Sequence, residues 1–174
     1  MFSFETRSES KQKSSFVFVA DDNDTIHVNT STNTKVIEKD IGDFSFLNKS
    51  NDNYLAIITR VSDTTVWQLM IITAIGPDLG EYKAEGVLSN GAINIQVREV
   101  KQWEDGKTPV LKMICGYEFI MDNKSVAAVQ SSLDTFKKKF VWLNQQLDER
   151  LKSIIAAAAA SMLVHTDIQE STMK

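Results

Sequence analysis

The chain has 174 residues and a formal net charge of −4, which is long enough to bury a core without metals or disulfides. The acidic balance excludes the broad basic surface of a typical nucleic-acid-binding protein. The single cysteine, Cys115, excludes an internal disulfide, and no basic segment followed by an apolar run opens the chain. We therefore expect a cytoplasmic protein.

The first part of the chain predicts strands and turns. Residues 1–14 are polar after Phe4 and are expected to form a flexible N-terminal segment. Residues 15–122 carry short β-rich runs punctuated by turn residues, which predicts one antiparallel β domain. The early strands are predicted at 15–20, 25–30 and 34–39, followed by a loop over 41–53.

The middle of the sheet is predicted from the most apolar pair of runs, at 54–61 and 65–75. Asn90-Gly91 is the strongest short hairpin signal in the chain and joins strands predicted at 81–88 and 92–103. A last long strand is predicted to end near Met121 because apolar and polar residues alternate before it.

The stretch 125–164 contains neither glycine nor proline, so its backbone permits one continuous helix. Asp122, Asn123 and Ser125 offer N-cap chemistry at its start. Apolar residues recur at spacings of three and four, which predicts one buried helix face. They are Val126, Val129, Leu133, Phe136, Phe140, Leu143 and Leu147, and the stripe continues through Leu151, Ile154, Ala158 and Met162. We predict a long C-terminal helix over 123–166, packed on the sheet and extending beyond it, and a polar tail over 167–174.

The run 154–164 is apolar all round, and a helix of that kind is buried rather than solvated. It is too short to span a bilayer, which takes about 20 residues, so membrane contact is not expected. The open alternatives are a partner helix, such as the same helix of a second chain, or folding back onto its own domain. We take the first as the prediction. The predicted partner-binding residues are Trp142, Leu151, Ile154, Ile155, Ala158 and Met162.

The predicted fold class is α+β: an antiparallel barrel or sandwich of roughly seven or eight strands followed by one long helix. This order of elements resembles the pleckstrin-homology-like superfold, and Trp142 in the closing helix is compatible with it. The resemblance is architectural, so it implies a fold and no binding residues.

Residues for catalysis are scarce. His27 and His165 are the only histidines, and no cysteine or histidine spacing is typical of a metal site. Asp22 and Asp24 near His27 offer the only enzyme hypothesis, and a solvated turn explains the two aspartates better. We therefore predict no enzyme activity, no metal and no cofactor.

The function predicted is that of a non-enzymatic interaction protein, for example an accessory or inhibitor protein, which self-associates or docks a protein partner through the helix. The alternative is a carrier that holds a lipid or other apolar molecule inside the curled sheet. The residues that would surround such a ligand are Ile57, Leu69, Ile71, Met113 and Phe119.

Overall fold

The computed structural model describes the backbone of residues 3–20, 24–41, 44–75, 82–103, 105–109, 114–131 and 138–172. The strands are β1 (Ser3–Val19), β2 (Thr25–Ile41), β3 (Phe44–Arg60), β4 (Val66–Ile75), β5 (Tyr82–Ser89), β6 (Asn94–Val100), β7 (Gly116–Met121), β8 (Lys124–Gln130) and β9 (Phe140–Leu143). One helix, α1 (Glu149–Thr172), follows them.

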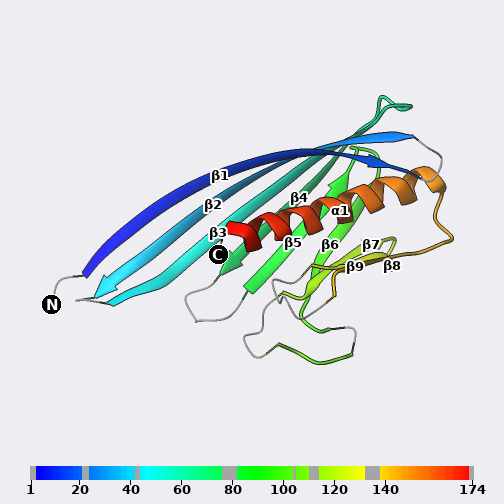
Figure 1. The fold of residues 1–174 in the computed structure, drawn as a ribbon. Coiled ribbons are helices and arrows are strands. Elements are labelled where there is room, and N and C mark those ends of the chain that lie inside the picture. Colours follow the sequence, from blue (N-terminus) through cyan, green and yellow to red (C-terminus); the bar gives the residue numbers. More distant parts are fainter. Residues whose placement is uncertain are drawn as a thin grey trace.

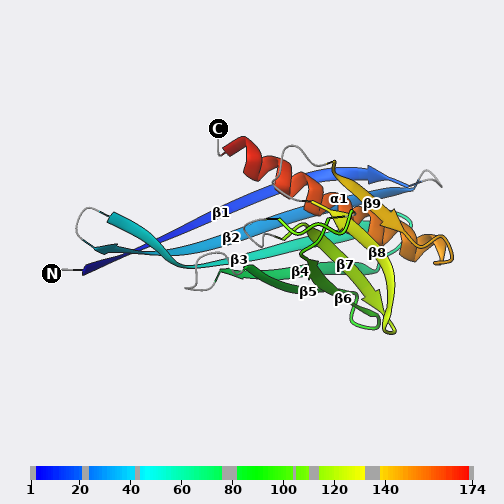
Figure 2. The ribbon, with the colours of Figure 1, turned by 90° about the horizontal axis from the view of Figure 1, so that it is seen from below.

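The nine strands form one antiparallel sheet in the order of the sequence, so each strand pairs with its neighbours in the chain. The sheet curves around α1, and β9 lies beside the N-terminal half of the helix (Figures 1 and 2). The prediction of an antiparallel sheet followed by one C-terminal helix is confirmed. The expected closure into a barrel is wrong, because β1 and β9 remain unpaired edges among the described strands.

Strands β1–β3 have 17 residues each and are much longer than the others. Because β4 ends at Ile75, opposite Ser50, the parts of β1–β3 beyond this row form a three-stranded arm (Figure 1). The arm contains segments that were expected to be a flexible terminus and a loop. These segments pair as strands instead, with a register shift between β2 and β3 after Ile37. Opposite charges face each other at Glu9 and Lys35, close to the start of the arm.

The chain between β7 and β8 is a tight turn and not the start of a helix. Asp122 and Asn123 have φ angles of 51° and 60°, and Met121 pairs with Lys124 across them. Two consecutive residues in the left-handed region are typical of a type I′ hairpin, which asparagine and aspartate tolerate. The predicted helix over 123–166 is therefore wrong in its first half, which forms β8 and β9 among the described residues.

The helix begins at Glu149, where Asp148 caps it. The Asp148 carboxylate accepts hydrogen bonds from the backbone N–H groups of Arg150 (3.0 Å) and Leu151 (3.2 Å), which satisfies donors that a helix start leaves unpaired. Trp142 lies in β9, outside the helix, so the residue that fitted the pleckstrin-homology-like resemblance is not in the closing helix.

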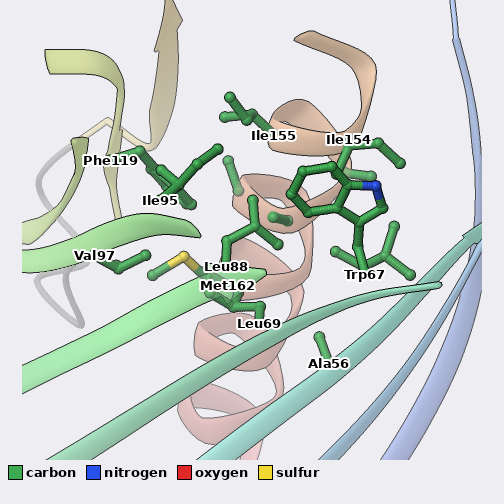
Figure 3. Packing of buried hydrophobic residues seen from close by; sticks show 14 of the residues in the cluster. Ala56, Trp67, Leu69, Leu88, Ile95, Val97, Phe119, Ile154, Ile155 and Met162 are labelled. Atoms are coloured by element: carbon green, nitrogen blue, oxygen red, sulfur yellow. The ribbon is translucent and has the colours of Figure 1, made fainter. Parts of the chain in front are cut away.

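The core lies between the concave face of the sheet and α1 (Figure 3). Trp67 and Leu69 from β4 and Phe119 from β7 meet Ile154 and Met162 of the helix within one buried cluster. Trp67 and Cys115 are buried, at 6% and 1% exposure. No helix within the described residues combines the length and apolar character that crossing a membrane requires.

Candidate ligand-binding site

Four of the predicted partner-binding residues face the protein's own core. Ile154, Ile155, Ala158 and Met162 are between 0% and 4% exposed and pack against the sheet. The helix folds back onto its own domain, so this face is not open to a partner. Leu151 is half-buried, and Trp142 alone of the six is exposed, at 49%.

The opposite side of α1 faces outward and is only half-buried. Lys152, Ala156 and Ala160 follow one another at spacings of four, which places them in one line along the helix. This outward stripe, as we name these three residues, explains why the run looked apolar all round. One side fills the core, and the other side carries two alanines where a surface helix would carry polar residues.

A pocket of about 430 Å³ lies over the first turns of this stripe. Its walls come from the two edges of the open sheet, with Phe18 and Ala20 at the end of β1 and Leu143 in β9. Its floor is the start of α1. We call it the seam pocket, because it lies where the sheet would have to join β1 to β9 to close. The helix residues that line it are Glu149, Lys152, Ser153 and Ala156.

The seam pocket has one basic and one acidic side chain among the residues that line it. Lys152 Nζ donates a hydrogen bond to Glu149 Oε1 at 2.6 Å. The two partners differ in exposure, since the Lys152 side chain is 14% exposed and that of Glu149 is 74% exposed. Water screens the carboxylate, so this ion pair contributes little stability. The ammonium group is thus held in the pocket by a partner that solvent can replace at little cost.

A polar cluster lies at the other end of the helix. His165 Nδ1 is 3.4 Å from Thr32 Oγ1, and His165 Nε2 is 3.8 Å from Asp52 Oδ2. These residue types can form a catalytic triad, but Thr32 is 5% exposed, so its hydroxyl is not accessible to a substrate. The cluster attaches α1 to β2 and β3.

A second cluster lies near the start of the helix. Asp24 accepts hydrogen bonds from Ser62 and from Arg60, which is buried. The Ser62 bond is the largest cause that lowers the pKa of Asp24, and Arg60 adds to it against the opposing effect of desolvation. His27 is exposed on the convex face, and Asp22 lies outside the described residues. Asp24 is thus engaged in an ion pair, and no contact between it and His27 supports the enzyme hypothesis.

The site differs from the ligand cavity that the sequence suggested. Leu69, Ile71 and Phe119 do point to the concave side, but α1 fills the space over them. Ile57 is half-exposed on the convex side, and Met113 lies outside the described residues. The residues that line the seam pocket were missed, and the only signal for them was an apolar run with a single base, Lys152, near its start.

Comparison with protein-family models, with curated proteins and with solved structures finds no match. Among the described residues, no group of three or more histidine, cysteine, aspartate or glutamate side chains is arranged to hold a metal ion.

Proposed function

We propose that the protein is a non-enzymatic binding protein that holds an apolar molecule in the seam pocket. The observation that carries this proposal is the outward stripe of α1, which leaves Ala156 half-exposed on the floor of a pocket whose walls include Phe18 and Leu143. Water gains no hydrogen bonds from these side chains, so an apolar occupant would be favoured. The volume of about 430 Å³ falls within the range of small-molecule sites, about 300–1,000 Å³.

The site also explains how a carrier can be built without a hollow interior. In this protein α1 occupies the concave face of the sheet, and the ligand would lie on the outer side of the helix, between the two sheet edges. Entry then requires no opening of the core. Because β1 and β9 are not paired with each other, a small change in their separation would adjust the pocket to its ligand.

The test is binding of an uncharged chain, 1-dodecanol, measured by isothermal titration calorimetry. Ala156→Phe places a ring in the pocket and should abolish binding. Ala160→Phe is the matched control, because Ala160 lies on the same half-buried stripe and does not line the pocket. Wild type and Ala160→Phe should bind. Absence of binding to wild type, or equal binding to all three proteins, would overturn the proposal.

A second candidate function, docking of a protein partner or a second copy, is favoured by Trp142. Its side chain is 49% exposed on β9, an edge strand whose outer backbone groups are unpaired in the described sheet. Tryptophan is enriched where binding energy concentrates, and a free edge accepts an added strand. Four of the other predicted partner-binding residues face the core and do not contribute to this surface: Ile154, Ile155, Ala158 and Met162.

The self-association form of this candidate is tested by solution mass. Light scattering of wild type should give more than one chain, and Trp142→Ser should restore the monomer mass. A single-chain mass for wild type at every concentration would remove self-association and leave only a different protein as the partner.

A further inference from the structure

We infer that the ligand of the seam pocket is a single-chain amphiphile with a carboxylate headgroup, and that Lys152 is the residue that recognises it. This inference rests on the proposed function and adds the chemical class of the ligand. It is carried by the position of one ammonium group in a pocket whose other walls are largely apolar.

The first step is the burial of the base. The Lys152 side chain is 14% exposed and lines the same pocket as Phe18, Leu143 and Ala156. Burying a charged group costs free energy unless it is paired. Lys152 is paired with Glu149, whose carboxylate is largely exposed, so an anion inside the pocket would be a better partner. The apolar walls favour an aliphatic chain beside that anion. A fatty-acid-like molecule combines the two.

The second step is the weakness of the existing partner. Glu149 forms the ion pair with Lys152 from three residues earlier on the helix, and its side chain is 74% exposed. A ligand carboxylate would replace the Glu149 carboxylate, which would return to water with little loss. A carboxylate bound inside the pocket would be less exposed than that of Glu149, so water would screen its attraction to the ammonium less.

The third step is orientation. Lys152 and Ala156 are one helical turn apart on the outward stripe. A carboxylate on Lys152 would direct its chain over Ala156, which lines the pocket. Alanines permit this close approach because they project so little from the helix.

The experiment compares dodecanoate with 1-dodecanol, which has the same chain and no charge, on the full-length protein near neutral pH. Wild type should bind dodecanoate about tenfold more tightly than dodecanol, the difference expected for one charge-assisted hydrogen bond. Lys152→Gln should remove this preference, so that dodecanoate and dodecanol bind with equal affinity. Lys152→Arg should retain most of it, and Glu149→Gln, which removes the competing carboxylate, should increase it.

The outcomes separate the two proposals. Equal binding of dodecanoate and dodecanol to wild type would overturn the assignment of Lys152 and leave the apolar pocket standing. Loss of both ligands in Lys152→Gln, with an unchanged unfolding midpoint, would show a packing role in place of headgroup recognition. Failure of wild type to bind either ligand would overturn the proposed function together with this inference.

Discussion

The imidazole ring of His165 lies against the phenol ring of Tyr54, with ring centroids 4.7 Å apart and ring planes inclined by 35°. The contact joins the C-terminal half of α1 to β3, far from the capped start of the helix. Tyr54 is 5% exposed, so the pair closes one end of the core.

Removing this ring should loosen the end of the helix. We expect His165→Ala to lower the free energy of unfolding by about 1 kcal/mol, the usual size of an aromatic pair, and His165→Phe to retain most of it. Urea denaturation measures both. A loss of equal size in the two variants would mean that the polar contacts of His165, and not its ring, stabilise the helix.

The hydroxyl group of Tyr54 should contribute nothing to stability. It is buried and forms no hydrogen bond of standard geometry with the described residues. Burial raises the pKa of Tyr54, and the nearby Ser161 offsets a smaller part of this rise. Because an unpaired buried hydroxyl costs about 1–3 kcal/mol, Tyr54→Phe should leave the unfolding free energy unchanged or increase it. A clear decrease would reveal a hydrogen bond that the geometry does not show.

The two sides of α1 should respond differently to the same substitution. Ala158 is 0% exposed against the sheet, and overpacking a core costs about 1–3 kcal/mol. Ala158→Leu should therefore destabilise the protein by that amount in urea denaturation. Ala156→Leu, on the outward stripe, should change stability by less than about 0.5 kcal/mol. Equal losses in both would contradict the assignment of the two helix faces.

Acid should destabilise the protein through two aspartates. Asp63 accepts hydrogen bonds from the backbone N–H (2.9 Å) and the hydroxyl (2.8 Å) of Thr65, in that order the largest causes that lower its pKa. The pKa of Asp24 is lowered as well. A carboxyl whose pKa is lower in the folded state stabilises it above the unfolded pKa of about 3.9. This stability is lost as the pH falls through the folded pKa.

The measurement is the unfolding free energy between about pH 6 and about pH 2. The loss of unfolding free energy in acid should be smaller in Asp24→Asn and in Asp63→Asn than in wild type, and smallest in the double variant. An unchanged acid dependence in the double variant would assign acid sensitivity to other carboxyl groups.

Local signals in the sequence predicted the turns and the apolar strands well. Asn90-Gly91 forms the predicted hairpin between β5 and β6, with Gly91 at φ 89°, where a side chain would be strained. Ile95 and Val97 are buried, as their alternation predicts.

The false helix has a specific cause. The β7–β8 register shifts after Phe119, so Val126 and Ala127 are both buried on the same strand. This bulge breaks the period of two and leaves Val126 and Val129 at a spacing of three, which a helix shares. The type I′ turn at Asp122 and Asn123 added to the error, because these residues also cap helices.

The residues that line the seam pocket could not be predicted from local patterns in the sequence. Phe18, Leu143 and Ala156 come from three distant parts of the chain, and only the curvature of the sheet brings them to one pocket. The long arm was also unpredictable, because its polar residues carry no alternation of apolar and polar side chains.

The order of the strands has a consequence for synthesis on the ribosome. Each strand can pair with the one made just before it, so the sheet can grow as the chain emerges. Its concave face, with Leu69 and Phe119, then stays uncovered until the 24 residues of α1 leave the exit tunnel. Nascent chains that stop before Glu149 should therefore expose an apolar surface and bind chaperones. Chaperone binding should end in one step once α1 has been released and covers this surface.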